Sequence, residues 1–352
     1  MSEIAKPPTS EQLEKEMETS SLSSVLQGYQ LTATFIAAIE LDIFTAIDEG
    51  STTLESIATR CDCSRQGTKV ILGVLVILNL VNKNRDEYQL THAGLSFSRH
   101  HPNYEGDAIR GYVATPRVRN FFCDPGSHFR RGGCENMGAK HFPGNDDIWV
   151  GFARERAPYR RAIASEVASR LAGRICDPKR VLDVAASHGA FGIEIARRYP
   201  SAAIFALDIP AVLDVTREHA AEEEVDTQMN YIPGDVRNVD IGNDYDLIFV
   251  TGMLEFLGQS AVLSLFRKLR LALRPHGALV IVQIFLNDDL VSPHRAVLYS
   301  IKLIEDCPES FIPTISEMRE LCYRSGFASI ESSVLSSEEC LLIASGSKEI
   351  TH

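Results

Sequence analysis

The sequence predicts a mixed α/β protein, in which a helical N-terminal domain with a small two-stranded hairpin precedes a doubly wound α/β domain. Three observations support this fold class. From Arg180 onward, short apolar segments alternate with amphipathic segments of helical period, which is the pattern of strands and crossover helices in a parallel sheet. The first apolar segment ends in a turn of small residues that leads into a helix. The N-terminal third instead shows helical periodicity followed by two short strand-like segments.

The N-terminal region is expected to contain a tail and a winged-helix domain. Residues 1–20 are polar with scattered charges, which predicts a disordered tail. Residues 21–147 are predicted to form the winged-helix domain and, at its end, a Gly- and Pro-rich segment that covers a cleft. Helices are expected over residues 35–47, 53–60 and 64–78, and two strands over residues 80–90.

Winged-helix domains can read DNA, but the second helix of this one lacks suitable side chains. After Arg65 and Lys69 it is almost wholly aliphatic, whereas recognition of base edges needs basic or amide side chains. The formal net charge of -12 also disfavours binding to nucleic acid or to anionic lipid. We therefore expect this domain to form a homodimer and not to bind nucleic acid.

Composition excludes several other classes. The 352 residues, 45% of them hydrophobic, suffice for two folded domains. The longest apolar stretch, residues 70–81, is shorter than the roughly 20 residues that cross a bilayer, and the N-terminus lacks a signal-peptide pattern. Eight cysteines without a C-x-x-C pair predict neither a zinc site nor a disulfide framework. We expect a cytoplasmic protein without a membrane segment or a bound metal.

The C-terminal half is expected to begin with a linker helix over residues 148–172 and to continue as a Rossmann-like domain over residues 173–352. Its last two strands are predicted to form a hairpin. Strands are expected over residues 181–184, 204–208, 230–233, 246–250, 278–285, 329–335 and 340–344.

The turn after the first of these strands predicts a ligand site. Asp183 lies in that strand, and Ala185–Gly189 form a turn of small residues at the start of a helix, where unpaired N–H groups attract a carboxylate or a phosphate. The next strand ends in Asp208, which a parallel sheet would place beside Asp183. A carboxylate there can accept both hydroxyl groups of a ribose. The segment indicates a nucleoside cofactor, although a ligand-free strand, turn and helix is the alternative.

The turn does not fit a dinucleotide. Ala185, Ala186 and Ser187 stand where glycine is needed for close approach of a pyrophosphate. S-adenosylmethionine carries no phosphate and tolerates these side chains. The turn therefore favours S-adenosylmethionine as the cofactor.

Four segments, in this order and spacing, resemble the two-domain O-methyltransferases that use S-adenosylmethionine on small molecules. They are Val-Leu-Asp-Val-Ala-Ala-Ser-His-Gly at 181–189, Ala-Leu-Asp-Ile-Pro-Ala-Val-Leu at 206–213, Gly-Asp-Val at 234–236 and Leu-Arg-Pro-His-Gly-Ala-Leu-Val-Ile-Val at 273–282. The resemblance covers nearly all of the chain beyond the tail. It implies a winged-helix dimerisation domain and a Rossmann-like domain that binds S-adenosylmethionine.

The resemblance also assigns roles at the cofactor site. Asp208 would bind the ribose hydroxyls, Ile209 would lie against the adenine, and Asp235 would accept a hydrogen bond from the adenine amino group. For Asp235 the alternative is a residue that only shapes a turn. The turn at Ala185–Gly189 would line the methionine end. The cofactor-binding residues implied in this way are Asp183, Ala185, Ser187, Gly189, Asp208, Ile209, Gly234, Asp235, Val236 and Thr251.

The catalytic residues depart from the family. Glu255 stands where the resemblance expects a histidine base, and Gln283 stands where plant members place the acid that steadies it. Glu255 could take the proton itself if burial raised its pKa, with Gln283 holding it in place, or His128 could replace the missing base. Alternatively, an amine, a thiol or an activated carbon would need little deprotonation. The structural alternative is that Glu255 is a solvated acid at a helix N-terminus.

An apolar pocket for a flat substrate is also expected. Its candidate residues are Phe121, Trp149, Phe152, Met253, Phe256, Tyr299 and Leu303. Together these features predict methyl transfer from S-adenosylmethionine to O, N, S or an activated carbon of a small aromatic or polyketide-like metabolite. The alternative is an enzyme of the same fold that binds the cofactor but performs pericyclic, decarboxylation or hydroxylation chemistry.

Overall fold

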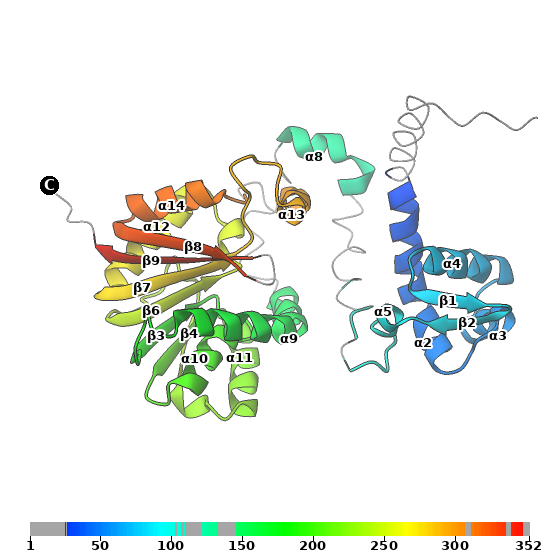
Figure 1. Ribbon diagram of the computed structural model, residues 1–352, viewed down its shortest axis with the longest axis horizontal. Helices are drawn as coiled ribbons and strands as arrows, with labels where there is room; N and C mark the ends of the chain where they lie inside the picture. The colour runs from blue at the N-terminus through cyan, green and yellow to red at the C-terminus, as the bar shows by residue number, and fades with distance from the viewer. Residues whose placement is uncertain are drawn as a thin grey trace, which may run out of the picture. The chain divides into compact units, whose positions relative to one another are not determined.

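The computed structural model describes residues 25, 27–102, 104–106, 109, 121–131, 146–306, 311–335 and 339–347. The chain divides into two compact units, Met1–Phe122 and Cys123–His352. Both are coloured by residue number in Figure 1. The predicted tail, residues 1–20, lies outside the described residues.

The first unit contains the predicted pair of helices and the hairpin. Residues 27–40 are helical. The elements that follow are α2 (Ile43–Asp48), α3 (Leu54–Arg60), α4 (Arg65–Ile77), β1 (Val81–Asn84), β2 (Glu87–Leu90) and α5 (His92–Leu95). Two helix starts are fixed locally, because the side chains of Thr53 and Ser64 accept hydrogen bonds from the backbone N–H groups of Ser56 and Gly67. The strands β1 and β2 pair antiparallel, so the winged-helix prediction is confirmed.

The aliphatic helix α4 is buried on one side only. Ile71, Leu72 and Leu75 lie in the core of the first unit, where they pack with residues of α2 and α3. Val70 and Ile77 are instead 52% and 68% exposed. The outward side of α4 is polar at Arg65, Gln66 and Lys69 but apolar at Val70 and Ile77, and exposed apolar residues suit contact with protein.

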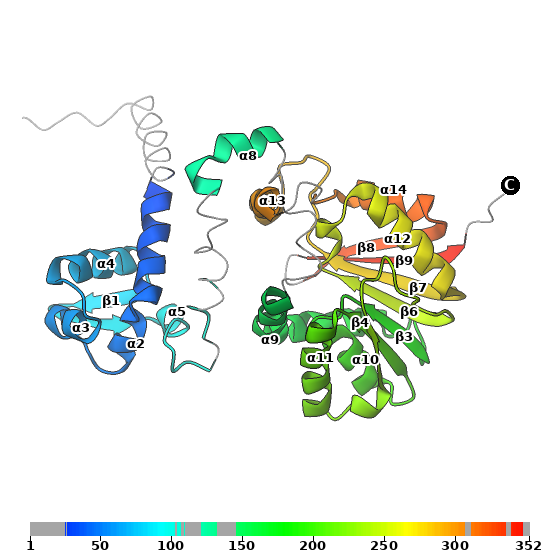
Figure 2. The ribbon, with the colours of Figure 1, turned by 180° about the vertical axis from the view of Figure 1, so that it is seen from behind.

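The second unit is built on a seven-stranded sheet with the order β5-β4-β3-β6-β7-β9-β8 (Figures 1 and 2). The first five strands in this order run parallel, whereas β9 pairs antiparallel with both β7 and β8. This is the predicted doubly wound sheet with a terminal hairpin. The strands are β3 (Arg180–Val184), β4 (Ala203–Asp208), β5 (Met229–Pro233), β6 (Tyr245–Thr251), β7 (Leu273–Gln283), β8 (Phe327–Val334) and β9 (Cys340–Ser347).

Helices cover both faces of the sheet (Figures 1 and 2). Alternate strand residues point to opposite faces, so Val181 packs with α9, α10 and α11 in one core, while Leu182 packs with α12 and α14 in the other. The helical elements of this unit are α8 (Pro125–Arg131), α9 (Asp146–Leu171), α10 (Ala190–Arg198), α11 (Pro210–Glu222), η1 (Asp226–Gln228), η2 (Leu254–Phe256), α12 (Gln259–Ala272), α13 (His294–Asp306) and α14 (Ile315–Arg324).

The strand order reverses direction at the middle of the sheet. The chain runs from β3 outward through β4 and β5, then returns to the other side of β3 as β6. In open α/β sheets, ligands bind at the carboxyl ends of the strands at such a reversal. Within the described segments, no helix is both long enough and apolar enough to cross a bilayer.

Candidate cofactor and active site

The turn after β3 has a left-handed backbone at three of its five residues. The φ angles are 53° at Ala185, 55° at Ser187 and 77° at Gly189. A residue with a Cβ atom pays roughly 1–2 kcal/mol for this conformation, so the surrounding structure must hold the two non-glycine residues. The buried hydroxyl group of Thr216 does so by donating a hydrogen bond to the carbonyl oxygen of Ser187 at 2.7 Å. The predicted turn is therefore a tight and well-anchored bend.

Asp208 at the end of β4 is bonded directly to this turn. Its Oδ2 accepts a hydrogen bond from the Ser187 N–H at 2.8 Å, and its Oδ1 accepts one from the Ile209 N–H at 2.8 Å. Burial raises the pKa of Asp208 to about 6, against the effect of these two hydrogen bonds. The side chain is nevertheless half-buried rather than enclosed, so its oxygens can still meet hydroxyl donors of a ligand.

Asp183 lies beneath the turn and is only 1% exposed. Its Oδ2 accepts a hydrogen bond from the Gly192 N–H of α10 at 3.0 Å, while Oδ1 has no hydrogen-bond partner among the described residues. Burial raises its pKa to about 7. The strands β3 and β4 pair in parallel, so the two acids lie on neighbouring strands as predicted. Asp208 is the one with access to solvent, and contact of Asp183 with a cofactor stays a prediction.

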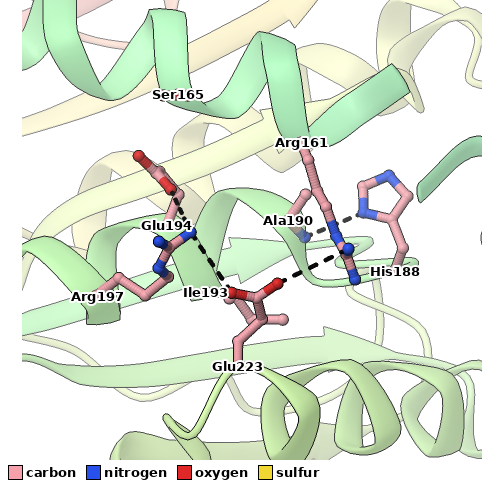
Figure 3. Close-up of a pocket in the computed structure, with 8 residues that line it drawn as sticks. All are labelled: Arg161, Ser165, His188, Ala190, Ile193, Glu194, Arg197 and Glu223. Atoms are coloured by element: carbon pink, nitrogen blue, oxygen red, sulfur yellow. Dashed lines mark hydrogen bonds and ion pairs between the residues drawn. The ribbon is translucent and has the colours of Figure 1, made fainter. Parts of the chain in front are cut away.

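A small polar cavity borders the other side of the turn (Figure 3). It has a volume of about 190 Å³ and lies between α9 and α10. His188 Nδ1 accepts a hydrogen bond from the Ala190 N–H at 3.0 Å, so this imidazole holds the start of α10. Arg161 and Arg197 approach the carboxylate of Glu223 to 3.7 and 3.5 Å.

The loop after β5 presents Asp235 to the same edge of the sheet. The Gly234 N–H donates to the Asp208 carbonyl oxygen at 2.9 Å, which ties this loop to the end of β4. Arg237 Nε lies 3.0 and 2.9 Å from the two carboxylate oxygens of Asp235. Burial alone would raise the pKa of Asp235, but the hydrogen bonds from Arg237 outweigh it and lower the pKa. Lys268 donates to the carbonyl oxygen of Val236 at 2.7 Å, so the loop is anchored from α12 as well.

Glu255 is buried directly after β6. The residue lies in η2 and is only 6% exposed. The Tyr299 hydroxyl donates a hydrogen bond to its Oε1 at 3.4 Å. The Phe311 N–H donates to its backbone carbonyl oxygen at 3.2 Å. This burial contradicts the alternative of a solvated acid at a helix N-terminus. A carboxylate in such surroundings can act as a general base when a proton donor is brought to it.

Gln283 ends β7 and is only 3% exposed. Neither its Oε1 nor its Nε2 has a hydrogen-bond partner among the described residues, so the expected support of Glu255 by Gln283 is not seen in this part of the chain. The Tyr299 hydroxyl donates to Glu255 instead. Gln283 lies opposite Cys340 of β9, whose neighbours belong to the core under α12 and α14. An unsatisfied amide in such a core is costly, and a role of Gln283 in catalysis stays a prediction.

Most of the predicted substrate-binding residues gather in one aromatic cluster. Trp149 of α9 makes edge-to-face contacts with Phe152 and Phe256, with ring centroids 6.0 and 5.6 Å apart. Tyr299 and Leu303 of α13 pack into the same cluster.

The other two predicted pocket residues lie elsewhere. Met253 belongs to the core under α12 and α14. Phe121 lies in the first unit, where it contacts Phe122 edge to face at 5.6 Å. Thr251 ends β6 beside Val282 of β7, at the same carboxyl edge as Asp208.

His128, the candidate replacement base, is buried in α8. Its Nδ1 donates to the Asp124 carbonyl oxygen at 2.9 Å, which makes Nε2 the basic nitrogen of the neutral ring. The helix α8 packs against α13, the helix that carries Tyr299. Its part in catalysis stays a prediction.

Two charged residues at this edge were not singled out from the sequence. Arg160 Nη1 of α9 lies 2.9 and 2.8 Å from the two carboxylate oxygens of Glu339, and both side chains are only 8% exposed. A usable signal was present for Arg160. It lies in helical register with Ala153, Ala164 and Val167, which form the buried stripe of α9. For Glu339 the sequence carried no comparable signal.

Sequence families agree with this geometry. The model of the O-methyltransferase domain matches residues 165–328, and the model of the O-methyltransferase dimerisation domain matches residues 23–99. Together they cover more than half of the chain.

Individual proteins give the same result. The chain is 23% identical over 329 residues to the tetracenomycin polyketide synthesis 8-O-methyl transferase TcmO of Streptomyces glaucescens, covering 89% of this chain and 94% of that protein. The crystal structure of a candidate O-methyltransferase of Nostoc punctiforme is 29% identical, with a TM-score of 0.83 over 92% of this chain and 98% of its own. Human N-acetylserotonin methyltransferase, solved in complex with SAM, shares the fold at 18% identity, with a TM-score of 0.76 over 98% and 100% of the two chains.

The left-handed turn, the acid bonded to it and the two matched domains lead to one conclusion. This chain belongs to the family of S-adenosylmethionine-dependent O-methyltransferases that carry an N-terminal dimerisation domain.

Proposed function

We propose that this protein transfers a methyl group from S-adenosylmethionine to an oxygen atom of a small aromatic or polyketide-like metabolite. The observation that carries the proposal is the half-buried carboxylate of Asp208, which two backbone N–H groups hold at the end of β4 above the left-handed turn. The name of the Streptomyces relative supports a polyketide-like acceptor. The aromatic cluster around Trp149 supports a flat one.

The residues present fit the adenosine part of the cofactor. Asp208 would accept hydrogen bonds from the ribose hydroxyls, and Ile209, which packs against a small core of α9 and α11 residues, would line the adenine. The carboxylate of Asp235 is kept ionised by Arg237 and would accept a hydrogen bond from the adenine amino group. Gly234 and Val236 flank it. These assignments rest on their shared position at the carboxyl edge of β4 and β5.

The residues present also fit the amino-acid part of the cofactor. The turn with Ala185, Ser187 and Gly189 ends at the N-terminus of α10, which favours a negatively charged group. Thr251 ends β6, the strand that pairs with β3. We assign the cofactor's carboxylate to the guanidinium of Arg160, the most deeply buried cation described at this edge. When bound, the cofactor supplies a methyl group activated by its positively charged sulfur.

The protein's own contribution to the chemistry would be proton removal and exclusion of water. Glu255 is buried beside Tyr299 and Phe256, so a hydroxyl group placed against its carboxylate would meet a base shielded from solvent. The acceptor's proton would move to a carboxylate oxygen of Glu255. Before that transfer, the hydrogen bond from the Tyr299 hydroxyl would stabilise the ionised carboxylate. Trp149 and Phe152 would hold the ring of the acceptor.

Mass spectrometry of the reaction tests this proposal. The purified protein would be incubated with S-adenosylmethionine and a panel of phenolic and polyketide-like compounds. We expect S-adenosylhomocysteine to appear together with a product heavier by one methyl group. Conversion of an acceptor while the cofactor stays intact would overturn methyl transfer in favour of another chemistry of the same fold.

The dimerisation domain supports a homodimer as the working form of the protein, and we propose that it works in the cytoplasm. The exposed apolar residues of α4, Val70 and Ile77, are consistent with such contact between subunits. Light scattering coupled to size-exclusion chromatography tests the oligomeric state, and a monomer at micromolar concentration would contradict the first part of this proposal.

A further inference from the structure

The ion pair between Arg160 and Glu339 joins two segments that are 179 residues apart in the sequence. Arg160 comes from the middle of α9, and Glu339 directly precedes β9. Both carboxylate oxygens of Glu339 lie within hydrogen-bond distance of a single guanidinium nitrogen, Nη1 of Arg160. Because the two side chains are each only 8% exposed, the pair is shielded from water and its geometry is closely restrained.

The rest of the guanidinium group is surrounded by parts of the candidate cofactor site. Its central carbon lies 5.1 Å from the ring centroid of Phe191, in the first turn of α10. A methyl group placed on Gly252, directly after β6, would lie 3.9 Å from Arg160 Nη2 and would meet no other atom within 4 Å. The charge of Arg160 also acts on Asp183 under the turn. Nη1 thus contacts Glu339, whereas Nη2 lies near Gly252 at the end of β6.

We propose that Glu339 is a positioning residue, which holds the guanidinium of Arg160 so that Nη2 meets the carboxylate of the bound cofactor. This inference rests on the proposed function, because it assumes that Arg160 binds that carboxylate. The terminal hairpin, formed by β8 and β9, thereby takes part in cofactor binding without touching the cofactor.

The physical reason is the length and freedom of an arginine side chain. An unrestrained guanidinium samples many rotamers, and fixing it on binding costs side-chain entropy. Glu339 fixes it beforehand through two charge-assisted hydrogen bonds. The Phe191 ring supports the flat face of the same group. Binding of the cofactor carboxylate then needs no further ordering of Arg160.

Calorimetric titration with two ligands tests the inference. S-adenosylhomocysteine carries the carboxylate, whereas methylthioadenosine shares its adenosine part but lacks the amino-acid group. In Glu339→Gln, we expect the affinity for S-adenosylhomocysteine to fall about tenfold, the range for loss of one charged hydrogen bond. The affinity for methylthioadenosine should stay within about twofold. Decarboxylated S-adenosylhomocysteine, which keeps the amine, should behave like methylthioadenosine.

A matched control is available nearby, between the chain after α9 and the terminal hairpin. Arg174, just beyond α9, forms an exposed ion pair with Glu331 of β8. Glu331→Gln removes a contact between the same parts of the second unit without touching Arg160, and it should leave both affinities unchanged. Glu339→Asp, which keeps the charge, should recover part of the lost affinity and also serves if Glu339→Gln melts at a much lower temperature.

The possible outcomes distinguish a failure of the proposed function from a failure of the role given to Glu339. If the wild-type protein binds neither ligand, the proposed function fails. If it binds both equally well, the assignment of Arg160 to the carboxylate fails. If it prefers S-adenosylhomocysteine and Glu339→Gln keeps that preference, or loses affinity for both ligands alike, Glu339 has only a structural role and the inference is overturned.

Discussion

The two halves of the carboxyl edge of the sheet are built in different ways. At the ends of β3 and β4, backbone N–H groups bond to the acids, although Oδ1 of Asp183 has no partner among the described residues. Asp208 accepts two N–H donors, and Asp183 accepts one from α10. At the ends of β6 and β7, the contacts come from side chains instead. The amide of Gln283 has no hydrogen-bond partner among the described residues, and the Tyr299 hydroxyl donates to Glu255 at 3.4 Å.

This difference matches the two kinds of ligand that the edge is expected to hold. A cofactor that is the same in every turnover suits a fixed frame of backbone hydrogen bonds, which loses little entropy on binding. An acceptor of particular shape requires side chains that become satisfied only when it is present. In the half built from β6 and β7, the unsatisfied amide of Gln283 therefore lowers the stability of the fold, as groups at functional sites commonly do.

The largest effect is expected on the side of β6. Replacing Glu255 with Gln keeps the shape of the side chain but removes the base. We expect turnover of an acceptor found in the methyl-transfer screen to fall about 10²- to 10⁴-fold. Affinity for S-adenosylhomocysteine, measured by calorimetry, should change by less than about twofold. Turnover at the wild-type rate in this variant would show that Glu255 is not the base, and that proton transfer is not the task of the β6 side.

The next largest effect is expected on the side of β4. Asp208→Ala removes the acceptor for two ribose hydroxyls and leaves the N–H groups of Ser187 and Ile209 unpaired. Each charged hydrogen bond contributes about 1.5–3 kcal/mol, so affinity for S-adenosylhomocysteine should fall at least about 100-fold. Asp214→Ala, at an exposed acid paired with Arg217 on α11, is the control and should bind normally. An unchanged affinity in Asp208→Ala would remove Asp208 from the cofactor site.

The same division explains what the sequence could predict. The sheet, the turn at Ala185–Gly189 and the acid after β4 are local features, because strand period, small residues and helix starts are set by neighbours in the chain. The Rossmann-like unit and the winged-helix unit were accordingly predicted and are confirmed. The position of Gln283 at the end of β7 was also predicted.

The contacts of the acceptor side were not predictable in this way. Tyr299 reaches Glu255 from 44 residues away, and Glu339 reaches Arg160 from 179 residues away. Such contacts depend on how α9, α13 and the terminal hairpin pack together. Adjacent arginines at 160 and 161 have opposite roles, one buried and one at the rim of the small cavity, and only the helical phase of α9 distinguishes them.

A smaller effect, about tenfold, is expected from pH. The pKa of Asp208 is raised by burial to about 6, and ribose hydroxyls favour its ionised form, so binding lowers that pKa. Affinity for S-adenosylhomocysteine should therefore be constant above about pH 7 and should weaken as pH falls through 6. Calorimetry at pH 7 and pH 5 should differ by about tenfold, since one unit below the pKa about a tenth of the group is ionised. Asp208→Asn should bind weakly and show no such dependence. The same pH dependence in that variant would mean that another group titrates.

The smallest expected effect sharpens the contrast at β7. In Gln283→Leu, an apolar side chain of similar volume replaces an amide whose two polar atoms are buried without partners. Removing unsatisfied groups should raise the free energy of unfolding by about 1–2 kcal/mol, measured by urea denaturation. If the amide serves the acceptor, turnover should fall at the same time. Gln228, whose amide donates to three backbone carbonyl oxygens, is the matched control: Gln228→Leu should destabilise the protein. A lower free energy of unfolding in Gln283→Leu would show that the amide has a structural partner and does not destabilise this half of the edge.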